Sequence, residues 1–145
     1  MSAFGADFAL QEAMFAALIA AAPVTSLLAD GANGIYEAVP DGADLPLLVI
    51  GDNELTQGDL KACERWIGKV TIEAHTQQTP GEDPPRELAK AILAAVENVL
   101  DDTLAVTGYD IIVLSNDFTG STVSPIDNKS VLGRLTYNLD MVQAA

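Results

Sequence analysis

Apolar residues first recur at helical spacing over residues 8–22, where Ala fills most positions between the larger side chains. Asp7 can cap the first turn, and Pro23 ends the helix directly after Ala22. The predicted helix is apolar around much of its circumference. We therefore expect it to be buried on more than one side, by a sheet and by a neighbouring subunit.

A second helix is predicted over residues 85–100. Asp83 followed by Pro84 favours a helix start, because Pro is well tolerated at the first helical position. Its apolar stripe consists of Leu88, Ile92, Val96 and Val99. Asp101 and Asp102 are predicted to lie in the following loop, since the negative end of the helix dipole disfavours acidic side chains.

Strand patterns occur in two pairs, one before the second helix and one after it. Residues 45–50 are a continuous apolar run, and residues 66–75 alternate between apolar and polar, with Trp66 in the buried set. After the helix, residues 109–114 are apolar on both faces. Residues 131–142 show the clearest alternation in the chain and predict a half-exposed strand.

The segments between these elements are polar and contain turn residues. Residues 51–58 and 117–129 are predicted to be long hairpin loops, and residues 35–39 a short edge strand. The order is helix, two strands, helix, two strands. It predicts one α+β domain over residues 1–145, with a mostly antiparallel sheet of about four strands and two helices packed on one face.

Composition adds that this domain is acidic. Hydrophobic residues make up 49% of the 145 residues, and 21 acidic against 7 basic residues give a formal net charge of −14. Such a surface repels nucleic-acid phosphates and anionic membranes, which argues against a role in gripping DNA. The apolar N-terminus lacks the basic start of a secretory signal and is too interrupted to span a bilayer, so we expect folding in the cytoplasm.

Candidate catalytic and metal-binding residues are few. His75 is the only histidine, and neither a second His nor a suitable Cys accompanies it to complete a metal site. The lone Cys63 cannot form an internal disulfide and is expected to be inert. Oxygen ligands are offered by Asp52, Asn53, Glu54 and Asp59, and by Asp101, Asp102 and Asp110. Their offsets do not match a calcium-binding loop, and no phosphate-binding or Gly-x-Ser-x-Gly motif is present. The sequence therefore predicts no catalytic residue, metal or cofactor.

Several stretches together resemble a known family. Residues 34–40 read Gly-Ile-Tyr-Glu-Ala-Val-Pro, and residues 45–52 read Leu-Pro-Leu-Leu-Val-Ile-Gly-Asp. The other contributing stretches are residues 10–18, 71–74, 87–92 and 133–137. In this combination and order, the chain resembles phage tail completion proteins and tail terminators, which occur in siphophages, prophages and phage-like gene transfer agents. It departs from them at residues 74–77, Ala-His-Thr-Gln, where the family often has an aromatic, Arg-rich strand.

The resemblance implies a structural protein without enzymatic activity. A tail terminator forms a homo-hexameric ring, caps the polymerised tail tube and joins it to the head-closure or connector protein. It assembles in the host cytoplasm and resides in the tail of a virion or phage-like particle. DNA would pass through its lumen without specific binding, and no membrane is involved.

By analogy, loops at residues 51–61 and 117–129 would become ordered against the tube ring or the connector. The candidate contact residues are Asp52, Asn53, Glu54, Asp59, Phe118, Ile126 and Lys129.

Two other functions stay open on the sequence. A head-closure or head–tail joining protein shares small size and ring formation, although two well-patterned helices favour the terminator. A small cytoplasmic α+β enzyme or ligand-binding domain would use Asp, Ser and His75, but no motif supports it. A pocket with strongly shifted carboxylate pKa values, or a bound metal, would favour the enzyme.

Overall fold

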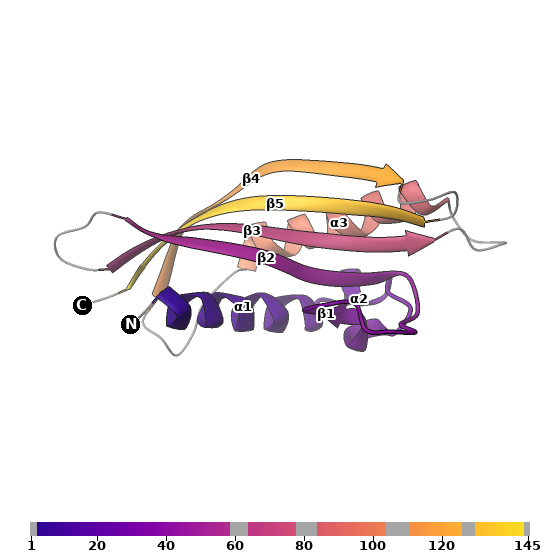
Figure 1. Cartoon of the computed structure of the whole chain (residues 1–145), viewed down its shortest axis with the longest axis horizontal. Coiled ribbons are helices and arrows are strands. Elements are labelled where there is room, and N and C mark those ends of the chain that lie inside the picture. Colours follow the sequence, from indigo (N-terminus) through magenta and orange to yellow (C-terminus); the bar gives the residue numbers. More distant parts are fainter. Residues whose placement is uncertain (1–2, 59–63, 78–83, 104–110, 126–129, 144–145) are drawn as a thin grey trace.

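The computed structural model describes residues 3–58, 64–77, 84–103, 111–125 and 130–143 (Figure 1). Along the chain, the elements are α1 (Ala3–Ile19), α2 (Ala22–Thr25), the 3-10 helix η1 (Gly31–Gly34), β1 (Ile35–Tyr36), β2 (Leu47–Gly58), β3 (Glu64–Gln77), α3 (Pro85–Thr103), β4 (Ile111–Pro125) and β5 (Ser130–Gln143).

The described strands form one sheet in the order β1-β2-β3-β5-β4. The four long strands are antiparallel to their neighbours, whereas the short β1 pairs parallel to β2, with Ile35 opposite Leu48. β3 and β5 pair over their whole length, from Glu64 opposite Gln143 to Gln77 opposite Ser130. These two strands therefore form the centre of the sheet.

Both long helices cover the same face of the sheet, and the hydrophobic core lies between the two layers. α1 contacts β2 and α3, while α3 contacts β3, β5 and β4 (Figure 1). The inward-facing side chains of the central strands are Trp66, Val70, Ile72, Ala74, Leu135, Tyr137, Leu139 and Met141, all buried. Each fully buried aliphatic side chain among them contributes roughly 1.5–3 kcal/mol to folding.

The helices supply the other half of this core through one face each. Leu10, Met14 and Leu18 of α1 recur every four residues and are buried. Ile92 and Val96 of α3 show the same spacing and belong to the same cluster. The described residues thus share one hydrophobic core.

The structure confirms the α+β class, with two long helices on one face, and the central strands. Trp66 is 4% exposed and lies in the core, as predicted. The sheet itself differs from the prediction. It has five described strands and is mixed, because residues 35–39 yield a two-residue edge strand that runs parallel to β2.

Two segments that were predicted to be loops are strands. Residues 51–58 continue β2, and residues 117–125 continue β4. The register shifts between Ile50 and Asn53 in β2, and twice in β4, so an apolar alternation does not continue through these segments. Backbone pairing with β3 and β5 supplies the hydrogen bonds there, which lets polar residues occupy the strand ends.

The helix boundaries also need correction. α1 begins at Ala3, so Asp7 lies inside the helix and does not cap it. α3 continues to Thr103 and includes Asp101 and Asp102. The dipole penalty for an acidic residue near a helix C-terminus is only about 0.3–1 kcal/mol. Burial of Leu100 in the core, at 1% exposure, holds this end of the helix in place.

Close packing of α3 on β5 gives a test of this arrangement. A Cβ atom at Gly133 would lie 2.9 Å from Leu93 Cδ1 and 3.4 Å from Ala89 Cβ. Gly133→Val should therefore lower the free energy of unfolding by about 1–3 kcal/mol, the usual cost of overpacking. In urea denaturation, the control Gly120→Val should cost little, since no atom lies within 4 Å of its Cβ position. Equal losses in both variants would contradict the packing described.

Candidate assembly surfaces

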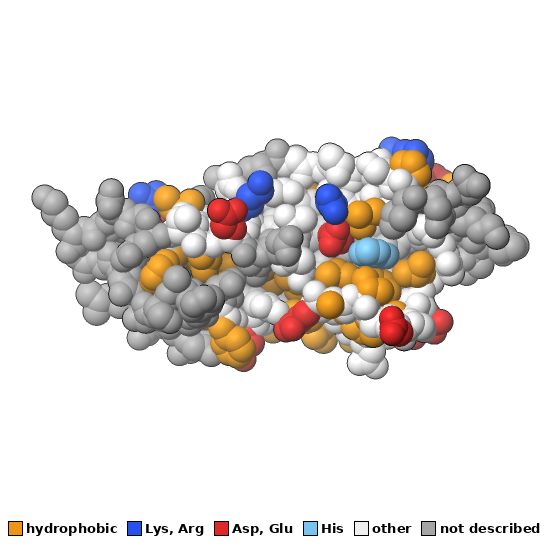
Figure 2. Space-filling view, viewed as in Figure 1, with side chains coloured by type: hydrophobic (Ala, Val, Ile, Leu, Met, Phe, Trp, Pro, Cys, Tyr) orange, Lys and Arg blue, Asp and Glu red, His pale blue; other side chains and the backbone are white. Residues whose placement is uncertain are grey.

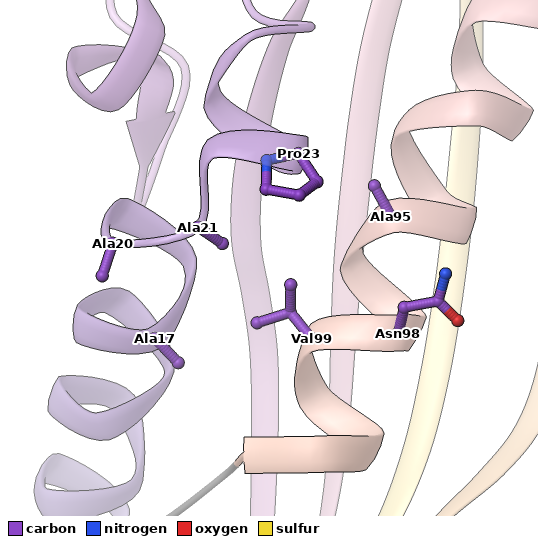
Figure 3. A pocket seen from close by; sticks show the side chains of 7 residues that line it. All are labelled: Ala17, Ala20, Ala21, Pro23, Ala95, Asn98 and Val99. Atoms are coloured by element: carbon purple, nitrogen blue, oxygen red, sulfur yellow. The ribbon is translucent and has the colours of Figure 1, made fainter.

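An apolar groove runs between α1–α2 and α3 on the helical side of the molecule (Figure 3). Its volume is about 740 Å³. It is lined by Ala17, Ala20, Ala21, Pro23, Ala95, Asn98 and Val99. Asn98 is the one polar side chain of this lining, and it is not a catalytic group. The groove can accept an apolar side chain from outside, but its lining residues can perform no chemistry.

α1 exposes large apolar side chains on its outer side. Phe8 is 61% exposed and Ile19 is 44% exposed. The sequence predicted that a neighbouring subunit covers this helix, and that stays a prediction. Exposed apolar groups of this size on a helix are typical of contact surfaces between proteins.

The face of the sheet turned away from the helices carries two ion pairs (Figure 2). Arg65 on β3 donates from Nε to Asp140 Oδ1 at 2.8 Å and from Nη2 to Oδ2 at 2.5 Å. This bidentate contact lowers the pKa of Asp140, chiefly through the hydrogen bonds from Arg65. Arg134 on β5 donates from Nε to Glu73 Oε2 at 3.0 Å.

A shallow cleft lies between these ion pairs. It is lined by Lys69, Gly120, Ser121, Thr122, Arg134 and Thr136, and its volume is about 420 Å³. Lys69 is exposed and has no ion-pair partner among the described residues. Two cations and several hydroxyl groups make this lining rich in hydrogen-bond donors, which suits an anionic group.

His75 lies near one end of the same face. Its Nε2 atom is buried and meets no hydrogen-bond partner within the described part of the chain. Burial lowers the pKa of His75, with Glu73 opposing the shift and Arg134 adding to it. The imidazole is therefore neutral at pH 7. A neutral, partly buried imidazole fits a structural role for His75 in the sheet.

The described ranges contain no group of three or more His, Cys, Asp or Glu side chains arranged to hold a metal ion. No helix among them is long and apolar enough to cross a membrane. Cys63 and Asp110, which were considered from the sequence, lie outside the described residues.

The described members of the predicted contact set lie midway along the sheet, on the strands β2 and β4. Asp52, Asn53 and Glu54 lie in β2, where Glu54 is exposed, and Phe118 lies in β4 opposite Tyr137. Asp59, Ile126 and Lys129 lie outside the described residues. The β2–β3 connection is at the Gln143 end of the sheet, and the β4–β5 connection is at its Gln77 end. Asn53 pairs with Val70, Val70 with Tyr137 and Tyr137 with Phe118, so Asn53 and Phe118 lie at the same level of the sheet and are separated across the strands, not along them.

Sequence reasoning missed the cleft and the helical groove. The alternation of β3 and β5 placed Lys69 and Arg134 on the outward faces of two strands. It gave no signal that these strands are neighbours.

The sequence model of the family described as "Tail completion protein gp17" matches residues 12–137, which include the lining of both the helical groove and the cleft on the sheet. The chain belongs to this tail completion protein family. Its members are structural proteins of phage tails and not enzymes, so the chain is a structural component of the tail of a phage-type particle.

Solved structures show the same fold. One chain of the "Virion of native gene transfer agent (GTA) particle" is similar, with a TM-score of 0.78 and 19% sequence identity. The match covers 97% of this chain and 99% of the other, so the whole architecture is shared. A comparison with curated proteins gives no match.

The buried histidine predicts a pH dependence of stability. Unfolding returns the pKa of His75 to its ordinary value near 6.5, above its value in the folded protein. The stability that depends on a neutral His75 is therefore fully present above about pH 6.5. It is lost as the pH falls through the lower pKa of His75 in the folded protein. Urea unfolding between about pH 7 and pH 5 should show a weaker loss of stability in His75→Gln than in the wild type. Parallel pH profiles for the two proteins would contradict this.

Proposed function

We propose that the chain is a tail terminator. Copies of it form a homo-hexameric ring that caps the polymerised tail tube and joins the tube to the head-closure or connector protein. The observation that carries this proposal is the family match over residues 12–137, which makes the chain a tail completion protein. The terminator is the member of that apparatus whose contacts this fold fits best, for two reasons.

The first reason is the length and polarity of the sheet. β3 and β5 each contain 14 residues, which corresponds to a length of about 45 Å at the rise of an extended strand. The pairing of β2 with β3 ends at Gly58 opposite Arg65, and the pairing of β4 with β5 ends at Pro125 opposite Val131, at opposite ends of this length (Figure 1). A protein that joins a tube to a connector needs two such distant contact regions on a rigid body.

The second reason is that the helical side exposes apolar surface on which identical copies could associate. α1 exposes Phe8 and Ile19, and an apolar groove separates α1–α2 from α3. A ring of identical subunits needs contacts of this kind on every copy. The net charge of −14 keeps DNA phosphates from adhering, so DNA can pass through the lumen without specific binding.

In this proposal, the predicted contact residues divide between the two partners. Asp59 serves one end of the ring and Ile126 and Lys129 serve the other, whereas Asp52, Asn53, Glu54 and Phe118 make contacts midway along the sheet. Because Asp52, Asn53, Glu54 and Phe118 lie in strands, their contacts form by docking of a preformed sheet.

Mass photometry with the cognate tail-tube protein tests the ring. We expect a species of about six times the 15.2-kDa monomer mass, either from the protein alone or only when tube is present. We also expect the protein to arrest tube growth. A monomer that leaves tube growth unchanged would contradict the proposal. Binding to the connector without any effect on the tube would indicate a head-closure protein.

Charge reversals at the two connections test the division of contacts. Asp59→Lys and Lys129→Glu each reverse one charge in the segments between paired strands and should leave the free energy of unfolding within about 0.5 kcal/mol of the wild type. Each variant should lose affinity for one partner and keep its affinity for the other, in pull-downs with tube and connector proteins. Loss of both partners in one variant, or of neither in both, would show that the assignment of contacts is wrong.

A further inference from the structure

Charged residues are unevenly distributed over this fold. The first 60 residues contain nine Asp and Glu residues and no Lys or Arg. These residues build α1, β1 and β2, so one edge of the sheet and the helix beside it are without basic side chains. In Figure 2, the lower edge of the described surface, over α1 and β1, shows red side chains and no blue ones.

The most exposed part of this acidic edge is the segment that connects β1 to β2. Glu37, Asp41 and Asp44 in this segment are all exposed. Gly42 adopts a positive φ of 73°, which allows the tight turn between Asp41 and Asp44. Gln11 Nε2 donates to Glu37 Oε1 at 2.6 Å and ties the start of the segment to α1. We refer to residues 37–44 as the acidic turn.

Two basic side chains, Lys69 and Arg134, line the cleft on β3, β5 and β4, away from the edge strand β1. Lys69 makes no ion pair with another described residue, although the exposed Glu54 lies directly opposite it on β2. Arg134 donates to Glu73 through Nε, and its side chain is 55% exposed. Its terminal amino groups can therefore still donate to a second carboxylate. Hydroxyl groups of Ser121 and Thr122 complete a lining of donors.

We infer that the acidic turn of one copy docks into the Lys69–Arg134 cleft of the next copy. Within one chain the two cannot meet, because the acidic turn leads from the edge strand β1 whereas the cleft lies on β3, β5 and β4. Between copies, a contact that joins two different surfaces is head-to-tail, and repetition of such a contact closes a ring when the rotation between copies allows it. The inference rests on the proposed ring and specifies the ion pairs that hold it.

A DNA phosphate is the other anion that the cleft could take. DNA carries phosphates along its whole length, so the net charge of −14 opposes its approach over an extended surface, whereas the acidic turn offers three carboxylates at one place. The carboxylates of a second copy are supplied by the chain itself, at a fixed position on a rigid edge. The observations therefore favour self-association.

Charge reversal with a matched control tests the contact. Lys69→Glu should weaken assembly about tenfold or more at low salt, in analytical ultracentrifugation alone or with the tube protein, because it sets like charges against each other. Lys90→Glu makes the same change in net charge on α3, at an exposed position far from the cleft lining, and should assemble like the wild type. The double variant Asp41→Lys, Asp44→Lys should fail as Lys69→Glu does. Circular dichroism should show all variants folded.

Mixing supplies the decisive outcome. Equal amounts of Lys69→Glu and of the Asp41→Lys, Asp44→Lys variant should assemble together, since each pairs with the other's complementary surface. Assembly of Lys69→Glu at wild-type strength, or failure of the mixture, would overturn the inference while the proposed ring stands. Absence of any wild-type assembly would overturn both. Loss of binding to a DNA fragment in Lys69→Glu, with assembly intact, would assign the cleft to phosphate and also overturn the inference.

Discussion

The pairing of β3 with β5 is the interaction on which the rest of the structure depends. These strands pair at every position, and their inward side chains meet both helices in one core. Because α1 and α3 lie on the same side, the opposite face of the sheet is left for charged and polar residues. The same pairing brings Arg65 to Asp140 and Glu73 to Arg134 across the strands. It thereby fixes the position of the cleft between these pairs.

This arrangement explains how a protein that is not an enzyme can act through its contact surfaces. A long, rigid sheet carries one connection at each end, acidic residues along one edge and a donor-lined cleft towards the other. Each of these surfaces is small. Repeated around a ring, however, contacts that are weak in one copy act together.

The sequence predicts much of this fold, and its failures have physical causes. Alternation in residues 66–75 and 131–142 identifies the central strands because one face of each is fully buried. The sequence did not predict residues 51–58 of β2 and 117–125 of β4 as strands. Register shifts near Asn53 and Gly120 interrupt the alternation of apolar and polar residues, and many of the side chains there are polar. The cleft was missed for another reason: Lys69 and Arg134 are 65 positions apart, and only the strand order brings them together. Membership of the tail completion family was predictable from short local stretches, some of which build the core, such as residues 47–50, whereas residues 37–40 are exposed.

Cryo-electron microscopy of tail tubes incubated with the purified protein measures the central claim most directly. The account predicts a six-fold ring of this domain on one end of each tube, with the sheet ends facing the tube and the free side. Tubes of undefined length with bare ends, or the protein bound along the tube wall, would contradict it.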